Sequence, residues 1–204
     1  MTLTVTFVRH AESWANVDPS NRIGGRDVNV ELTDRGVGQA LALRKRLEGR
    51  RFDYIYSSPA VRAIHTCTLA MQSQPDCTTP ELLEADSGDF SGLSRDIYDL
   101  PEIREQLNTD SWNFIPGFII KGESRHQVAD RMLKWLYTVI AQFDGNVTVF
   151  THGLAIKYML TELLYIDQQR ANEINIDNAS ITELKFTNGI LYPIVVINDT
   201  SHLE

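Results

Sequence analysis

The sequence has few cysteines and no long hydrophobic run. Its two cysteines, Cys67 and Cys77, cannot build the disulfide framework of a small secreted domain, and we expect free thiols in a reducing compartment. No apolar run approaches the ~18 residues that a membrane-spanning helix needs. The first residues also lack the basic and apolar regions of a secretory signal. These absences predict a cytoplasmic protein with no membrane partner.

Positive charge is also scarce. Nineteen Lys and Arg stand against 27 Asp and Glu, which gives a net charge of -8. A protein that binds nucleic acid without sequence preference needs a basic surface to displace counterions, so we expect no nucleic-acid partner. Net charge governs solubility and steering rather than single sites, so a small positive pocket is still compatible with this composition.

Several common catalytic signatures are missing as well. The chain has no Gly-x-Ser-x-Gly elbow, no Walker loop and no Gly-x-Gly-x-x-Gly after an expected strand. It also lacks the Cys/His sets and the i, i+4 histidine pairs that typically bind zinc. We therefore expect no metal site and no cofactor.

What is present is the pattern of one ordinary globular domain, residues 1–204. The hydrophobic fraction of 43% is close to the globular average. Apolar segments typical of strands alternate with amphipathic segments typical of helices, which predicts a mostly parallel sheet covered on both faces, an α/β three-layer sandwich. The expected strands are 3–8, 52–56 and 147–150, with a further short extended piece that ends at Leu82-Leu83. The expected helices are 33–47, 58–71 (capped by Ser58, with Pro59 first), 124–143 and 153–164.

Two regions depart from this alternation. The runs 181–186 and 191–197 flank Asn188-Gly189, which predicts an antiparallel C-terminal hairpin with Pro193 at an edge or a bulge. Residues 86–122 lose the periodicity, and we expect an inserted cap segment over one end of the sheet. Residues of this segment are candidates for the mouth of a site, although a solvated position fits them as well: Arg95, Arg104, Trp112, Phe114 and Lys121.

Reactive side chains follow the expected strands directly. Arg9-His10, Ser57-Ser58 and Thr151-His152 each come where a strand ends, and the carboxyl ends of parallel strands form one rim that binds ligands. Arg62 follows one helical turn after the serines, and Glu84 follows another extended piece. Arginines suit phosphate, and a neutral imidazole is a competent nucleophile toward phosphorus. The rim therefore favours phosphoryl chemistry.

These residues stand in motifs that resemble one family. Val8-Arg9-His10-Ala11-Glu12-Ser13, with Asn16 after it, resembles the Arg-His-Gly signature of the histidine phosphatase superfamily, also called the phosphoglycerate mutase-like family. Further segments resemble the family's other motifs in order and span nearly the whole chain. They are Leu32–Ala40, Tyr56–Thr66, Leu82–Gly92, Phe150–Gly153 and Asn198–Leu203.

The resemblance implies a role for each matching position. His10 corresponds to the nucleophile that becomes phosphohistidine, and Glu84 to the acid that protonates the leaving oxygen and then activates water. Arg9, Arg62 and His152 correspond to the catalytic groups that hold the phosphoryl oxygens, and Asn16 to a further substrate contact. The chemistry agrees, because phosphoryl transfer mainly needs positioning and charge stabilisation.

The sequence also departs from the family pattern. Ala11 replaces the usual glycine after the nucleophile. If that position requires positive φ, alanine costs roughly 1–2 kcal/mol; if it requires only a small side chain, alanine is tolerated. Ala85 and Ser87 replace larger apolar residues, so the Glu84 loop can differ in position.

Three functions fit this resemblance. We prefer a metal-independent phosphomonoesterase that acts through phosphohistidine on a small phosphorylated substrate or a phosphoprotein. A phosphoglycerate mutase-like phosphotransferase is the second, although mutases of the family are usually longer and carry a tryptophan where this chain has Ile23-Gly24-Gly25-Arg26-Asp27. The third is a weakly active relative that binds phosphorylated partners, for which an acid such as Glu84 is unnecessary. The sequence does not name the substrate or the oligomeric state.

Overall fold

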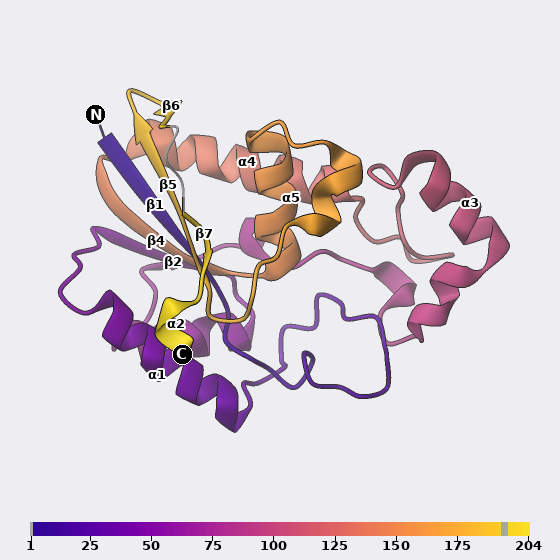
Figure 1. The fold of residues 1–204 in the computed structure, drawn as a ribbon, viewed down its shortest axis with the longest axis horizontal. Coiled ribbons are helices and arrows are strands. Elements are labelled where there is room, and N and C mark those ends of the chain that lie inside the picture. The colour runs from indigo at the N-terminus through magenta and orange to yellow at the C-terminus, as the bar shows by residue number, and fades with distance from the viewer. Residues whose placement is uncertain (1, 193–195) are drawn as a thin grey trace.

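A central sheet lies between two layers of helices (Figure 1). The computed structural model describes residues 2–192 and 196–204. The strand order is β3-β2-β4-β1-β5-β6, with β7 also paired to β5; the first four strands of this order are parallel and β5 is antiparallel to β1. The strands are β1 (Thr2–Arg9), β2 (Tyr54–Ser57), β3 (Cys77–Thr78), β4 (Gly145–Thr151), β5 (Ile181–Thr187), β6 (Ile190–Leu191) and β7 (Val196–Asp199).

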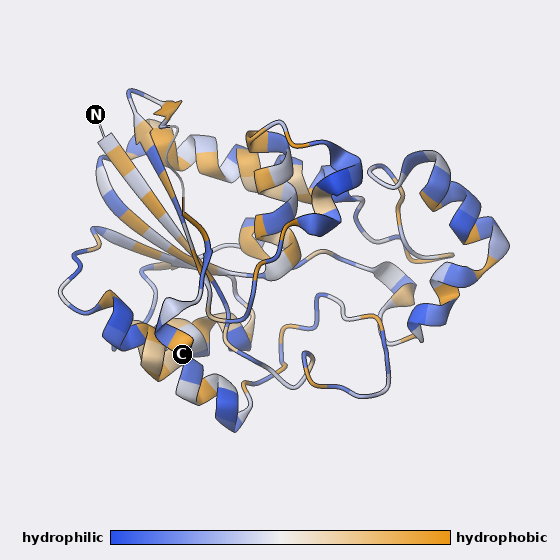
Figure 2. Cartoon of the chain, in the orientation of Figure 1, coloured by the Kyte–Doolittle hydropathy of each residue, from blue (hydrophilic) through white to orange (hydrophobic). Residues whose placement is uncertain are grey.

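Helices cover both faces, as the alternating pattern predicts. Helices α4 (Arg125–Gln142) and α5 (Gly153–Leu163) pack on one face, against alternate β1 residues such as Val5 and Phe7. Helices α1 (Asp34–Leu47) and α2 (Val61–Met71) pack on the other, against Val8. Apolar residues therefore concentrate between the layers, while the outer faces of the helices are polar (Figure 2). The predicted three-layer α/β fold with a mostly parallel sheet is confirmed.

Capping side chains set the starts of two helices. The Thr33 side chain accepts a hydrogen bond from the Gly36 amide, and Ser124 forms a capping box with Gln127. These contacts satisfy amide groups that have no partner within the helix. The expected helix starts at 33–34 and 124 are therefore confirmed. The expected turn at Asn188-Gly189 is confirmed too, since both residues have positive φ, as a tight hairpin turn requires.

Two local predictions are wrong. Ser58 does not cap α2: the helix begins at Val61 with Ala60 as N-cap, and the Ser58 hydroxyl bonds His152 instead. Leu82 is not extended, because Pro80 starts a 3₁₀ turn, η1 (Pro80–Leu82). Strand β3 lies earlier in the chain. The expectation for Pro193 concerns a residue outside the described ranges.

The segment 86–122 extends beside the sheet on the side of α5 (Figure 1). It contains η2 (Gly88–Phe90), η3 (Arg95–Asp99) and α3 (Pro101–Asp110), a helix that the sequence pattern did not predict because only Ile103 of α3 is buried. Phe90 and Ile103 form a small core with Ile23. Within the described ranges, no helix is long and apolar enough to cross a membrane.

Candidate active site

The carboxyl ends of β1, β2 and β4 bring the expected rim residues together. The His10 amide bonds the Thr151 carbonyl at 2.9 Å, and the Ser58 amide bonds the Phe150 carbonyl at 2.8 Å. The rings of His10 and His152 lie edge to face with centroids 5.2 Å apart. Both imidazoles are buried. The predicted convergence of these three strand ends is therefore present in the structure.

Hydrogen bonds assign different states to the two nitrogens of His10. Nδ1 lies 2.8 Å from the Ala11 carbonyl oxygen, which only accepts, so Nδ1 carries the proton. Nε2 accepts from Arg62 Nε at 3.3 Å and therefore holds a lone pair. Burial, with the charges of Arg62 and Arg9, holds the pKa of His10 well below 6.5. His10 is thus a neutral imidazole with Nε2 available for attack.

The two arginines are fixed by backbone carbonyls. Arg9 Nη1 donates to the Ile176 carbonyl and Arg62 Nη1 to the Asp27 carbonyl, each at 2.5 Å. Burial lowers the pKa of both, but a guanidinium stays charged at neutral pH. The remaining donors of these side chains suit an oxyanion in a fixed orientation.

Two buried side-chain nitrogens at the rim have no hydrogen-bond partner among the described residues. They are Arg9 Nε and His152 Nδ1. His152 Nε2 lies 2.8 Å from Ser58 Oγ, which already accepts from the Ala60 amide and so has its proton free for Nε2. This leaves the proton of His152 on Nδ1. Buried polar groups are nearly always paired, so two unpaired donors at one rim indicate an acceptor such as an oxyanion.

Glu84 lies at the N-terminus of α5. Its carboxylate accepts hydrogen bonds from the amides of Leu154 at 3.3 Å and Ala155 at 3.1 Å. This contact replaces the missing side-chain cap of α5, whose N-cap residue is His152. Glu84 and His10 line the same cleft, together with Arg9 and Arg62. The structure thus gives Glu84 a capping role as well as a place at the site.

Two arginines that the sequence did not single out position the Glu84 loop. Arg26 Nε and Arg131 Nη2 donate to the Glu84 carbonyl at 3.1 and 3.2 Å, and both guanidiniums also bond the Glu123 carboxylate. Arg26 precedes the Glu84 loop in the chain, and Arg131 follows it, in α4. No motif marks either arginine, so sequence reasoning had no signal for them.

Asn16 lies at the exposed edge of the cleft. Its Oδ1 accepts from the amide and the hydroxyl of Ser13, both at 2.9 Å, and from Asn178 Nδ2 at 3.2 Å. The Asn178 side chain also donates to the His10 carbonyl at 3.0 Å. Ala179, with φ of 58°, bonds the same carbonyl through its amide. The loop before β5 therefore braces the His10 backbone.

The alanine after His10 causes no backbone strain. Ala11 is absent from the residues with positive φ, and its amide donates to Thr66 Oγ1 at 3.0 Å. Its side chain is fully buried. The position requires a small side chain rather than a glycine conformation, so the backbone cost considered from sequence does not apply.

The motif at 32–40 holds the loop that follows His10. The Glu12 carboxylate accepts from Thr33 Oγ1 at 2.7 Å and from Arg35 at 2.8 Å. A Cβ on Gly36 would lie 1.9 Å from the Glu12 carbonyl oxygen. Glycine is required here because the backbone of Glu12 approaches α1 closely.

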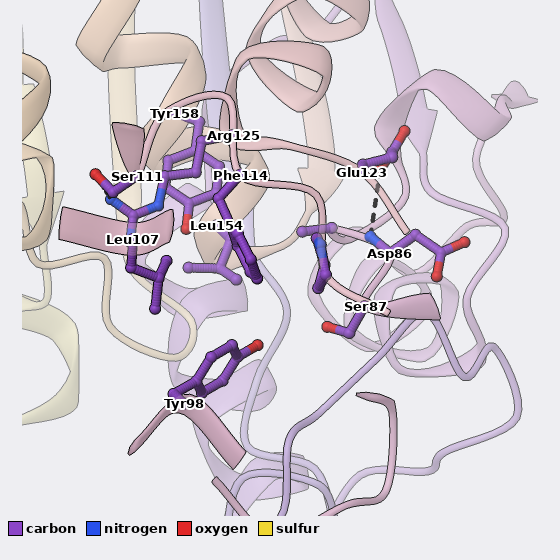
Figure 3. A pocket seen from close by; sticks show the side chains of 12 residues that line it. Asp86, Ser87, Tyr98, Leu107, Ser111, Phe114, Glu123, Arg125, Leu154 and Tyr158 are labelled. Atoms are coloured by element: carbon purple, nitrogen blue, oxygen red, sulfur yellow. Dashed lines mark hydrogen bonds between the residues drawn. The ribbon is translucent and has the colours of Figure 1, made fainter. Parts of the chain in front are cut away.

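The cleft continues into a side pocket through Ala85 and Leu154, which line both. Figure 3 shows the side chains around this side pocket. Arg95 lines the cleft and Phe114 lines the side pocket, whereas Trp112 is buried. Arg104 pairs with Asp99 on the surface, and Lys121 bonds the Gly117 carbonyl. In the described part of the chain, no group of three or more His, Cys, Asp or Glu is placed to hold a metal ion.

Two buried imidazoles, two fixed guanidiniums and a carboxylate at the carboxyl ends of parallel strands define an α/β protein suited to phosphoryl groups. The chain belongs to the histidine phosphatase superfamily (branch 1), whose family profile matches residues 5–200. The resemblance stated from the motifs is thereby confirmed.

Relatives in this family are phosphatases or mutases. The chain is 29% identical over 204 residues to phosphoserine phosphatase 1 of Hydrogenobacter thermophilus, covering 97% of this chain and 92% of the relative. It is 28% identical over 211 residues to phosphoglycerate mutase-like protein 4 of Arabidopsis thaliana, covering 98% and 86%. The crystal structure of phosphoserine phosphatase from Entamoeba histolytica with 3-phosphoglyceric acid shares the fold, with a TM-score of 0.83 at 23% identity, covering 99% of this chain and 100% of that chain.

Proposed function

We propose that the protein is a metal-independent phosphomonoesterase that acts through a phosphohistidine on His10. The observation that carries this proposal is the state of His10: Nδ1–H is held by the Ala11 carbonyl, and Nε2 presents a lone pair beside Arg62. A neutral, fixed imidazole between two cations is the nucleophile that an anionic phosphoryl group requires. The phosphatase relatives support the same reaction class.

In the first step, His10 Nε2 attacks phosphorus and the bond to the leaving oxygen breaks. Glu84 gives its proton to that oxygen, so the alcohol leaves neutral and Glu84 becomes a carboxylate. Arg9 and Arg62 neutralise the charge on the non-bridging oxygens, and the neutral His152 donates a hydrogen bond to one of them through Nδ1. The Ala11 carbonyl stabilises the imidazolium that carries the phosphoryl group, because it accepts the Nδ1 proton.

In the second step, water attacks phosphorus from the side that the alcohol left. The Glu84 carboxylate takes the water proton, and the bond between phosphorus and Nε2 breaks. Inorganic phosphate departs, His10 regains its lone pair, and Glu84 is protonated again. One carboxyl group serves both steps because both occur in line with His10.

The phosphohistidine can be trapped directly. Labelled p-nitrophenyl phosphate, mixed with the enzyme in EDTA and quenched in alkali, is expected to leave label on the protein that is stable in base and lost in acid. His10→Gln should carry no label, and Arg104→Gln, an exposed arginine outside the cleft, should label normally. Acid-stable label, or label retained in His10→Gln, contradicts the proposal. Loss of labelling in EDTA contradicts metal independence.

Transfer to a second alcohol is the other candidate, supported by the mutase relatives. A mutase must keep water from the phosphohistidine. The partition of the trapped phosphoenzyme between water and an added acceptor, such as glycerate, separates the two reactions. Release of phosphate alone supports the phosphatase. Protein that binds phosphate esters without labelling indicates the third candidate, a docking relative.

A further inference from the structure

A pocket begins at Ala85, the residue after Glu84, on the side where the leaving group of the proposed reaction must lie. Figure 3 shows the side chains that line it. Its cavity volume is about 190 Å³. It shares Ala85, the residue after Glu84, and Leu154, whose amide bonds the Glu84 carboxylate, with the catalytic cleft. Resting on the proposed function, this position assigns the pocket to the alcohol part of the substrate.

The walls of this leaving-group pocket are largely apolar and aromatic. Tyr98, Phe114 and Tyr158 present rings to it, and Leu107 and Leu154 add aliphatic surface. Burial raises the pKa of Tyr98 and Tyr158, so both phenols stay neutral. Such walls suit a flat apolar body, because aromatic faces stack on planar groups with little loss of conformational freedom.

The acidic residues of the pocket are already neutralised. Arg131 bonds the Glu123 carboxylate through Nε at 2.9 Å and Nη2 at 3.0 Å, and Arg26 bonds it as well. Asp86 accepts from the Gly88 amide at 2.8 Å and lies 3.7 Å from Arg26. These carboxylates therefore offer little negative charge to a ligand.

Arg125 also lines the pocket, and its positive charge is not neutralised by these carboxylates. Within the described residues it forms no ion pair with a carboxylate; Nη1 bonds Ser111 Oγ at 3.3 Å, and the guanidinium lies 5.8 Å from the Tyr158 ring centroid. Arg125 is also the first residue of α4, where a positive charge opposes the helix dipole. Because its contacts among the described residues are a hydroxyl and an aromatic ring, its positive charge is available to an anionic ligand in the pocket.

We propose that the leaving group of the substrate combines a flat apolar body with a carboxylate. The body lies against Tyr98, Phe114 and Tyr158, and the carboxylate binds Arg125, whose planar donors match it in two-point contact. Arg95, which lines the cleft and has no carboxylate partner within the described chain, adds positive potential near Tyr98. The substrate class is thus an aromatic or similarly planar alcohol bearing a carboxylate, esterified with phosphate.

Matched substrates test each part of this assignment. Benzyl phosphate, 4-carboxybenzyl phosphate and the methyl ester of the latter have leaving alcohols of similar acidity, so His10 and Glu84 face the same chemistry. We expect kcat/KM to be about 10–100-fold higher for the carboxylate than for its methyl ester, the range expected for a charged hydrogen-bonded contact. Benzyl phosphate should exceed ethyl phosphate by about tenfold, because the ring buries apolar surface.

Variants of Arg125 assign the preference to this residue. Arg125→Gln should reduce the ratio of kcat/KM for 4-carboxybenzyl phosphate to kcat/KM for its methyl ester to about 1. Arg125→Glu should disfavour the carboxylate and prefer the cationic 4-(aminomethyl)benzyl phosphate. Arg104→Gln, which replaces a surface arginine of α3, should keep the wild-type ratio. Ratios are compared within each variant, so a general loss of activity or of folded protein cancels.

The outcomes separate this inference from the proposed function. Equal kcat/KM for the carboxylate and its ester in the wild type overturns the inference, while benzyl phosphate turnover leaves the phosphatase intact. A preference that survives in both Arg125 variants also overturns it. Failure to hydrolyse or bind any of the five phosphate esters counts against the proposed function itself.

Discussion

The two nitrogens of His10 face different neighbours, and this difference sets its protonation. Nδ1 bonds a carbonyl of the chain, while Nε2 faces the guanidinium of Arg62. A positive neighbour disfavours a second proton on the ring, and burial does the same. The nucleophile therefore stays unprotonated at pH values where an exposed histidine is largely charged.

At this scale, the first prediction concerns the pKa of His10. NMR titration of ring-labelled protein is expected to show a His10 pKa below 6.5, and Arg62→Gln should raise it because one opposing charge is removed. The acid limb of kcat/KM should move in the same direction. Arg104→Gln serves as the matched control and should leave the titration in place. A His10 pKa at or above 6.5 in the wild type would contradict the assignment.

The second prediction separates Glu84 from the phosphate-binding arginines. Glu84→Gln should slow phosphorylation by benzyl phosphate about 10²–10⁴-fold and spare p-nitrophenyl phosphate, whose phenolate leaves with little help. Arg62→Ala should slow both alike, because it acts on the transferred group. Single-turnover kinetics are needed, since slow hydrolysis of the phosphohistidine can mask the difference.

Glu84 also caps α5, so its variants need a stability measurement. Loss of such a cap costs about 0.5–2 kcal/mol. Urea denaturation of Glu84→Gln distinguishes this loss from the loss of an acid. Equal rate losses on both substrates would remove Glu84 as the proton donor and leave it as a cap, with Asp86 the next candidate acid.

At the scale of elements, α1 carries two glycines with opposite requirements. A Cβ on Gly36 would clash with the Glu12 backbone, whereas a Cβ on Gly38 meets nothing within 4 Å. Gly36→Ala is expected to lower the free energy of unfolding by about 1–3 kcal/mol and to reduce activity by shifting the loop after His10. Gly38→Ala should raise the free energy of unfolding by about 0.5–1 kcal/mol, since alanine favours helices. Urea denaturation of both variants measures these changes. If both variants changed the free energy of unfolding in the same direction, the close approach of α1 to Glu12 would be contradicted.

Elements with local signals were predictable from the sequence. Helices α1 and α4 begin at Thr33 and Ser124 because side chains there bond the first amides of the helix. Helix α3 has no such capping side chain, and few of its residues face a core. Ser58 suggested a helix cap that is not formed, because its hydroxyl bonds His152, a partner distant in sequence.

Some residues of the site could also be predicted from the sequence and others could not. Residues placed by strand ends, such as Arg9, His10 and His152, could be located because parallel strands share one rim. Arg26 and Arg131 could not, because both act through Glu123 and the Glu84 carbonyl, which no local pattern connects to them. The roles of the rim residues stay predictions until the experiments above are done.

At the scale of the whole molecule, the buried histidines make stability depend on pH. His10 and His152 both have pKa values held well below 6.5, so the unfolded chain binds more protons than the folded one once the pH falls below about 6.5. Their contribution is fully present above this pH and is lost as the pH falls. The half-buried His202 acts in the same direction.

Urea denaturation without phosphate is therefore expected to show a stability that falls between pH 6.5 and 5.5, with each buried histidine contributing up to about 1.4 kcal/mol per pH unit. His152→Gln should reduce this slope, whereas Arg104→Gln, which changes an exposed arginine of α3, should not. A slope that His152→Gln leaves intact would contradict the neutral buried state. Aspartates such as Asp199, with a pKa of about 2, affect stability only at lower pH.

The place of β1 in the sheet bears on how the protein is made. This first strand is the one that carries His10 at its end, yet it pairs with β4, which begins at Gly145, and with β5, which begins at Ile181. During synthesis at ~5–20 residues per second, the strand waits on the order of ten seconds for its first partner. Contacts so distant in sequence slow folding. The nascent chain thus exposes its apolar strand β1 until β4 has been synthesised, and the active site forms only after that point.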